Sequence, residues 1–573
     1  MLRSNQQQQQ QSPEYKVVIA YDFGTSCSGA AYAFTDSTIP EVFDVQNWPN
    51  KSGNFSPKIP TLSVYQRRNE QQRQSSERSS LSEWGYGAKK AMLKPHAAKQ
   101  NILLSHFKLN LDESLQRPPL QNGLSPVQVV VDYLASLHQH TLRELSRALA
   151  DSYDSDTFRY CLTVPAIWSD KSKHLIRQAA IQAGLVTPSD PPNRLILISD
   201  PEAAALYCVE TMADQVQLNN NDRIMVCDAG GGTVDSIVFQ VNFPDNDEAN
   251  ANEDASERSH NNPMAQRRPQ LKEVTKGMGE SCGSVFLDDR YNELLRAKLG
   301  TDVINKIYPR EMDDLMSQFI DTIKPEFDGV TDQYVTLPRS VDLNELPANI
   351  RESDNGSLDE GVIELKAQEL KEYIFDPVVD KVLSLIERQY QQIPDGQLNF
   401  LFLVGGFGSS RYLYERIRRV FQGTRVNQII CPAERAALAV VRGAAYYGID
   451  PQVVVSRVSR RTYGITAAMP YEESIDPPSK RVVRANGNVQ CLTRFFPYVN
   501  KNDELPVDYD IQQPMYITYG TIESTNIMLF ATENDIIPRY HDEPGVHRVA
   551  NISIPIPNIP HMNTGEHLYF NVR

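Results

Sequence analysis

Hydrophobic residues near the start of the chain form short unbroken runs, which is the pattern of buried β-strands. Val17–Asp22 is the first such run, and a second, Ala30–Phe34, follows a turn of small and polar residues. Two strands joined by such a turn predict a β-hairpin. The same succession of apolar run, glycine-rich turn and apolar run recurs over 224–239. The chain therefore carries one local pattern twice.

Elsewhere in the first 450 residues, strand-like runs alternate with helical stretches. Tyr160–Pro165 and Leu398–Val404 predict short strands, and the stretch from Ser169 to Gly184 has the capping residues of a helix. Apolar residues at helical spacing also occupy Val127, Val130, Val131, Leu134, Leu137, Leu142, Leu145 and Leu149. Strands that alternate with helices predict an α/β fold.

The pattern changes near residue 450, where β-like alternation over 511–532 replaces the helical stretches. We therefore expect a C-terminal domain that is rich in β-strands and resembles a small sandwich. The predicted parts are a disordered Gln-rich tail at 1–14, a first lobe at 15–211 completed by 430–452, a second lobe at 212–429, and the β-rich domain at 453–573. Polar, low-complexity composition predicts flexible inserts at 67–82 and 245–270.

Composition excludes several classes of function. A net charge of −15 argues against a nucleic-acid partner, because neutralising phosphates requires a basic surface. No run of about 18 uncharged apolar residues offers a membrane span. A secretory signal would require an apolar segment near the start of the chain, but a glutamine run occupies positions 6–11. We therefore expect a cytoplasmic or nuclear protein. Seven singly scattered cysteines predict reduced, buried thiols rather than a zinc or redox motif.

The residues with the clearest chemistry lie in the turns of the two hairpins. In the first turn, Asp22 ends a strand and is followed by Gly24, Thr25 and Ser26. A glycine and two hydroxyl side chains allow backbone N–H groups and oxygens to approach a phosphate closely. Taken alone, such a turn is more typical of an ordinary hairpin.

The second hairpin repeats this design and thereby changes its interpretation. Asp228 precedes three consecutive glycines, Gly230, Gly231 and Gly232. Each glycine in a strand costs about 0.5–1 kcal/mol relative to alanine, so three in a row indicate a ligand that approaches the backbone closely. Asp22 and Asp228 are suited to Mg²⁺, which is held mostly through water.

A third glycine segment joins a predicted strand to a helix and contains Gly405 and Gly406. A nucleoside can lie against such a backbone without obstruction by side chains. The sequence has no Walker loop of the form Gly-x-x-x-x-Gly-Lys-Ser/Thr. We therefore expect ATP or ADP, with Mg²⁺, in a cleft between the two hairpin turns.

These three motifs, taken in order and together with Leu162–Asp170 and Ser199–Leu206, resemble the DnaK-type heat-shock chaperones of the actin-like ATPase superfamily. The resemblance covers roughly residues 15–450. It is strongest to the divergent eukaryotic branch that keeps the ATPase lobes and reduces the substrate-binding region. It implies duplicated actin-like (ribonuclease H-like) lobes with a cleft between them, followed by a β domain without a helical lid.

The resemblance also implies roles for single residues. Asp22 and Asp228 match the metal-associated aspartates, and the two glycine turns match the phosphate turns. Thr233 and Asp235 match residues near the attacking water. Lys108 resembles a lysine that contacts the γ-phosphate, and the alternative is an ordinary surface lysine.

Three further positions concern hydrolysis and the nucleoside. Asp200 stands where the family has a glutamate. Because its side chain is shorter, the resemblance implies nucleotide binding more firmly than it implies ATP hydrolysis. Lys324 and Arg411 resemble residues that flank the adenine and the ribose.

Three functions follow from these observations. The first is a slowly hydrolysing Mg-dependent ATPase whose lobe closure is coupled to the β domain, with protein clients or co-chaperones as partners. The second is a nucleotide-binding scaffold with negligible hydrolysis. The third is a small-molecule kinase on the same fold, which would require an acceptor-binding insert with an aspartate base that we do not find in the sequence.

Overall fold

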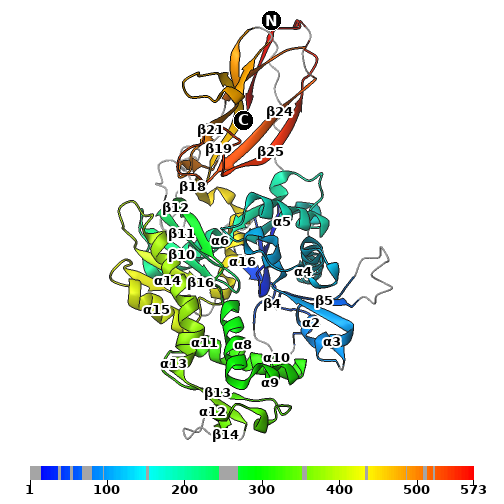
Figure 1. Ribbon diagram of the computed structural model, residues 1–573, viewed down its shortest axis with the longest axis vertical. Coiled ribbons are helices and arrows are strands. Elements are labelled where there is room, and N and C mark those ends of the chain that lie inside the picture. Colours follow the sequence, from blue (N-terminus) through cyan, green and yellow to red (C-terminus); the bar gives the residue numbers. More distant parts are fainter. Residues whose placement is uncertain are drawn as a thin grey trace, which may run out of the picture. The chain divides into compact units, whose positions relative to one another are not determined.

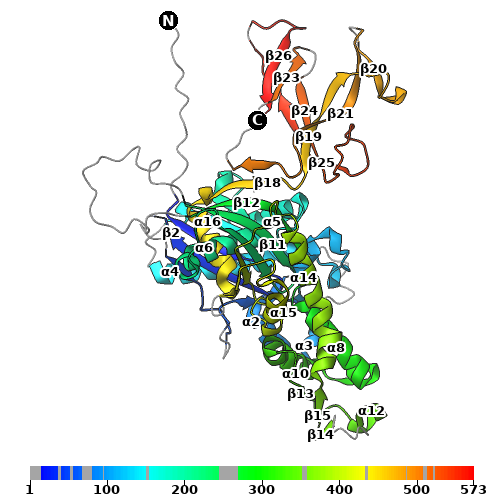
Figure 2. The same ribbon diagram turned by 90° about the vertical axis from the view of Figure 1, so that its left-hand side faces the viewer.

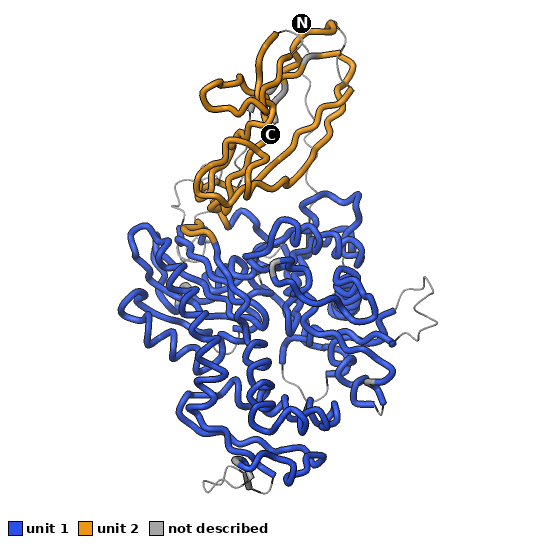
Figure 3. The backbone as a smooth tube through the Cα atoms, in the orientation of Figure 1, with its two compact units in different colours: residues 1–270, 277–453 blue, residues 271–276, 454–573 orange. Residues whose placement is uncertain are grey.

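The computed structural model divides into two compact units (Figure 3). Unit 1 comprises residues 1–270 and 277–453, and unit 2 comprises 271–276 and 454–573. The predicted tail at 1–14 and most of the two predicted inserts, 68–79 and 244–268, lie outside the described residues. The structure describes residues 15–35, 41–51, 56–67, 80–94, 96–149, 154–243, 269–351, 358–359, 361–432, 436–484, 487–507, 513–520, 523–559 and 561–572.

Unit 1 mixes sheets and helices, which confirms the predicted α/β class. In its first sheet, β1 (Val17–Asp22) pairs antiparallel with β2 (Cys27–Phe34), so the first predicted hairpin is confirmed. β1 also pairs in parallel with β8 (Phe158–Val164), which pairs in parallel with β9 (Leu195–Ser199). The strand order is β3-β2-β1-β8-β9, where β3 is Val42–Asp44, and β4 (Ile59–Pro60) pairs with β2.

A second sheet contains the second predicted hairpin. β10 (Arg223–Ala229) pairs antiparallel with β11 (Val234–Asn242) and in parallel with β16 (Phe400–Val404). β16 pairs in parallel with β17 (Gln428–Ile430). Both sheets thus contain a hairpin followed by two parallel strands, and each glycine turn leaves the sheet at the end of a strand with a parallel neighbour.

Two helices of small residues lie between these sheets, α6 (Asp200–Val216) and α16 (Ala439–Ile449) (Figure 1). α16 packs against β1, β2 and β8, whereas α6 packs against β10 and β11. Their backbones approach so closely that a Cβ atom on Gly443 would lie 1.6 Å from the Ala203 carbonyl oxygen. A glycine is therefore required where the two helices cross.

Two of the other helices of unit 1 were predicted from the sequence. The helical spacing over 127–149 is confirmed by α4 (Pro126–Leu149), and the capped stretch by α5 (Asp170–Gln182). Ser169 accepts a hydrogen bond from the Ser172 amide, as expected for an N-cap. On the second sheet, α14 (Asp376–Tyr390) packs against β11, and α15 (Arg411–Phe421) packs against α14.

Unit 2 is rich in β-strands, and its one helical element among the described residues is the 3₁₀ turn Pro478–Lys480. Its main sheet has the order β20-β21-β19-β24-β25, and β23 and β26 form a separate two-stranded ribbon (Figure 2). β18 (Val454–Val458) pairs with Leu271 and with β22 (Glu504–Pro506). The bounds of the other strands are Thr462–Pro470 for β19, Arg481–Val483 for β20, Val489–Val499 for β21, Gln513–Thr518 for β23, Ser524–Thr532 for β24, Val546–Pro555 for β25 and His567–Val572 for β26.

Candidate functional site

The two glycine turns, far apart in the sequence, lie against each other within unit 1. A Cβ atom on Gly231 would lie 2.3 Å from the Ser26 Oγ, and one on Gly232 would lie 2.5 Å from the Thr25 Oγ1. Since real side chains do not approach so closely, the contact depends on these positions being glycine. The first turn (24–26) and the second turn (230–233) therefore meet at one place.

The third glycine segment (405–411) lies against the second turn. Gly405 adopts a φ of +84°, and a Cβ atom there would lie 2.3 Å from the Ala229 carbonyl oxygen and 2.4 Å from the Asp228 Oδ1. The same Ala229 carbonyl accepts hydrogen bonds from the amides of Phe407, at 2.9 Å, and Gly408, at 3.2 Å. All three predicted motifs consequently adjoin one another.

The second turn is fixed by the start of α8 (Val285–Leu299). The carbonyls of Gly230, Gly231 and Gly232 accept hydrogen bonds from the amides of Ser284, Val285 and Gly283, at 3.1, 2.9 and 3.2 Å. Because its carbonyl groups are used in this way, the turn is held in one conformation. Its Gly230 amide in turn donates to the Thr233 carbonyl at 3.0 Å.

Four buried aspartates surround the meeting point of the turns. Asp22 and Asp228 lie at the ends of β1 and β10, Asp200 is the first residue of α6, and Asp235 lies opposite Asp228 in the second hairpin. Burial raises the pKa of Asp228 well above the ordinary value, and the negative charges of Asp200, Asp22 and Asp235 raise it further. Burial also raises the pKa of Asp200, against the opposing effect of Lys108. Such a cluster favours the binding of a cation.

Lys108, which the sequence pointed to, is buried and only 3% exposed. Its ammonium lies 3.9 Å from the Asp200 Oδ2, and 5.6 and 5.4 Å from the ring centres of Phe23 and Trp168. The aromatic faces stabilise its positive charge. The alternative of an ordinary surface lysine is therefore wrong, although contact with a phosphate stays a prediction.

The remaining predicted site residues, Asp235, Lys324 and Arg411, have different surroundings. Asp235 accepts a hydrogen bond through its Oδ1 from the Ala166 amide at 3.0 Å. Lys324 forms an ion pair of 2.7 Å with Asp288 of α8. Arg411 is exposed at the start of α15.

Lys58 is a further residue at the meeting point of the two turns, and no sequence motif indicated it. Its ammonium forms an ion pair with the Asp22 Oδ2, and its side chain is only 14% exposed. Burial lowers its pKa, but the carboxylates of Asp22 and Asp228 more than offset this, and the net pKa is raised. Lys58 lies between two prolines in a stretch without glycine or a repeated motif, so no signal in the sequence distinguished it.

The residues present fit a hydrated cation together with anionic oxygens. Among the residues that the structure describes, the buried Ser26 Oγ and Asp200 Oδ1 have no hydrogen-bond partner. In the part of the chain that the structure describes, no three His, Cys, Asp or Glu side chains come close enough to form a metal site by themselves. Mg²⁺ keeps most of its water and needs few carboxylates, so it fits this arrangement, whereas a closed zinc site does not.

Two further predictions concern the state of the cysteines and the lack of a membrane-spanning segment. All seven cysteines are free, five of them buried and Cys27 and Cys431 partly so. None of the helices among the described residues combines the length and the apolar character that crossing a membrane requires.

Comparison with known proteins gives relatives over nearly the whole chain. Heat shock 70 kDa protein 12A of Homo sapiens is 26% identical over 96% of this chain and 86% of its own length. Heat shock 70 kDa protein 12B of Homo sapiens is 24% identical over 95% of this chain and 84% of its own length. A shorter match, 35% identical, covers 20% of this chain and 15% of the Chaperone protein HscA homolog of Acidovorax sp. (strain JS42). No family model matches the chain.

These relatives confirm the predicted resemblance to the DnaK-type heat-shock protein family, in its divergent branch.

Proposed function

We propose that this relative of the 70 kDa heat-shock proteins binds ATP and ADP with Mg²⁺ where its three glycine segments meet, and that it hydrolyses ATP slowly. The observation that carries the proposal is the contact between the two turns, in which Gly231 lies against Ser26 and Gly232 against Thr25. Each turn follows an aspartate, so that Asp22 and Asp228 approach one polyphosphate from two sides. An ordinary hairpin turn requires no such partner.

The chain's own residues would divide the work of phosphoryl transfer among them. Backbone amides of both turns and the hydroxyls of Thr25 and Ser26 would bind phosphate oxygens. Asp22 and Asp228 would hold the hydrated ion; when bound, Mg²⁺ neutralises phosphate charge. Lys108 would place a buried positive charge near the γ-phosphate.

The nucleophile would be a water molecule that carboxylates orient. Asp235 is held by the Ala166 amide and lies in the same hairpin as Thr233, so the two could position that water. Asp200, with its Oδ1 unpaired, would bind a water of the metal shell. Because phosphoryl transfer depends mainly on positioning, a short Asp200 side chain is consistent with slow turnover.

Lobe closure would couple nucleotide binding to unit 2. The order β2-β1-β8-β9 in the first sheet recurs as β11-β10-β16-β17 in the second, which supports duplicated actin-like lobes. α6 and α16 pack together between them and could transmit a change of angle. Unit 2 would then be a reduced form of the peptide-binding sandwich of this family.

A nucleotide-binding scaffold without hydrolysis is the second candidate. The specific observation that favours it is the Lys58–Asp22 ion pair, since a carboxylate that is already neutralised binds a divalent ion less readily. In this case the nucleotide would act only as a ligand that stabilises one arrangement of the lobes.

Phosphate release from ATP separates these two functions. We expect the Asp228→Asn variant to release phosphate at least about tenfold more slowly than the wild type, because its side chain no longer attracts the hydrated ion. Asp395→Asn is a matched control, because this carboxylate lies on the surface in an ion pair with Arg223. Equal release by the wild type and Asp228→Asn would refute hydrolysis at this place, and calorimetric ATP binding by the wild type would then favour the scaffold.

A further inference from the structure

Lys58 is held rigidly beside the first turn. It directly precedes β4, which pairs with β2. Its amide donates to the Ser56 Oγ at 3.3 Å, and its carbonyl accepts from the Tyr86 hydroxyl at 3.1 Å. The aliphatic stem lies over β2, where a Cβ atom on Gly29 would be 3.4 Å from the Lys58 Cγ and Cε. The ammonium is therefore directed at Asp22 by its backbone and its stem.

This arrangement places a buried positive charge at the carboxylate that we assign to the metal. Lys58 engages the Asp22 Oδ2 and also interacts electrostatically with Asp228. A buried ion pair is weak grounds for a purely stabilising role, since its desolvation cost is comparable to its attraction. A nucleotide bound as proposed would place a phosphate at the first turn, close to the Lys58 ammonium. Lys58 thus has one anionic partner in the protein and another in the proposed ligand.

We propose that Lys58 is a resident cation of the nucleotide site, which neutralises Asp22 when no divalent ion is bound and thereby reduces the dependence of nucleotide affinity on Mg²⁺. This inference rests on the proposed nucleotide binding. With Lys58 present, Asp22 repels a phosphate less in the absence of metal. Lys58 also competes with Mg²⁺ for the same carboxylate.

Removing the ammonium should change the two nucleotide affinities in opposite directions, and both changes raise their ratio. Nucleotide without metal meets an unneutralised Asp22 and binds more weakly, whereas Mg²⁺ loses its competitor and binds more tightly. The ratio of nucleotide affinity in Mg²⁺ to that in chelator therefore rises. Hydrogen bonds to charged groups contribute about 1.5–3 kcal/mol, so we expect this ratio to rise about tenfold or more.

The test is calorimetric titration of the full-length chain with ADP, which is not hydrolysed, in excess Mg²⁺ and in excess chelator. Lys58→Met should raise the ratio, and Lys58→Arg should keep the wild-type value. Lys298→Met is the matched control, because Lys298 is equally exposed at 14% and pairs with Glu369 at 2.8 Å in an ion pair away from the turns. If circular dichroism shows that Lys58→Met is unfolded, Lys58→Gln, which can still donate to Asp22, takes its place.

The outcomes distinguish this inference from the proposed function. A wild type that binds ADP, with a ratio that Lys58→Met or Lys58→Gln leaves unchanged, overturns the role of Lys58 and leaves nucleotide binding intact. A wild type that binds ADP in neither condition overturns nucleotide binding, and the role of Lys58 with it.

Discussion

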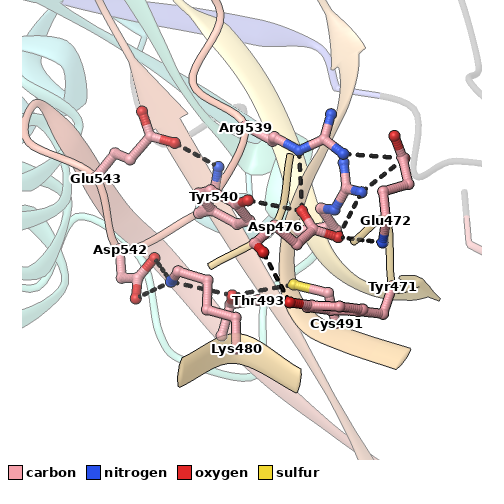
Figure 4. A network of polar contacts seen from close by, with 11 residues as sticks. Tyr471, Glu472, Asp476, Lys480, Cys491, Thr493, Arg539, Tyr540, Asp542 and Glu543 are labelled. Carbon is pink, nitrogen blue, oxygen red and sulfur yellow. Dashed lines mark hydrogen bonds and ion pairs between the residues drawn. The ribbon is translucent and has the colours of Figure 1, made fainter. Parts of the chain in front are cut away.

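Replacing Asp476 by alanine should destabilise unit 2 by about 3–5 kcal/mol, because it removes a fully buried carboxylate and leaves Arg494 with only the half-exposed carboxylate of Glu472. The Asp476 side chain is fully buried and accepts four hydrogen bonds (Figure 4). The donors are the Glu472 amide at 2.8 Å, Arg494 at 2.9 Å, Arg539 at 3.1 Å and the Tyr540 hydroxyl at 2.6 Å. These groups belong to the segment after β19, to β21 and to the segment before β25, so one carboxylate ties three parts of the unit together.

The loss of stability in unit 2 is best measured by amide hydrogen exchange of its peptides in the full-length chain. Global unfolding would be less informative, because two units need not unfold in one step. Asp542→Ala is the matched control within the same network. Asp542 pairs with Lys480, but its side chain is 51% exposed. A pair of this kind contributes at most about 1 kcal/mol. Equal protection losses in the two variants would contradict the central role of Asp476.

The effect of Asp476 also has a defined pH dependence. Burial raises its pKa, but the hydrogen bonds from Glu472, Tyr540 and Arg539 outweigh burial and hold the pKa well below the ordinary value. A carboxyl group with a lowered pKa stabilises the folded state above its unfolded pKa, and this contribution is lost as the pH falls toward the folded pKa. The difference between wild type and Asp476→Ala should therefore stay constant from about pH 8 to about pH 5.

The elements that carry the candidate site could be predicted because their signals are local. An unbroken apolar run that ends at Asp22 and a second that ends at Asp228 each predict a strand followed by a turn, and both hairpins are confirmed. The start of α6 is similarly local, since Ser199 and Glu202 form a reciprocal capping box. This cap fixes Asp200 as the first helical residue.

Contacts between residues that are far apart in the sequence could not be predicted in the same way. Lys58 reaches Asp22 only because β4 pairs with β2, and the two-residue strand β4 has no periodicity to detect. Asp476 likewise looks like any acidic loop residue until the chain brings Arg494 and Arg539 to it. In both cases the partner is specified by topology and not by neighbouring residues.

Substituting alanine for Gly283 should slow ATP hydrolysis by roughly a hundredfold, as a displacement of about 1 Å at a catalytic site can do. A Cβ atom on Gly283 would lie 2.4 Å from the Gly231 carbonyl oxygen, 2.5 Å from the Gly231 carbonyl carbon and 2.7 Å from the Gly230 carbonyl oxygen. All three obstacles are backbone atoms, so no side-chain rotation can relieve the clash. The second turn must move away from α8, and its alignment with Ser26 is then lost.

The neighbouring Ser284→Ala is the matched control for Gly283→Ala. Ser284 is the N-cap residue of α8, but its side chain makes no capping hydrogen bond to any residue that the structure describes, so the substitution leaves the second turn in place. Phosphate release and ADP affinity should fall together in Gly283→Ala and stay at the wild-type level in Ser284→Ala, with both proteins folded by circular dichroism. A folded Gly283→Ala that binds ADP and hydrolyses ATP as the wild type does would mean that the second turn does not touch the nucleotide, since its displacement would then have no effect on the ligand.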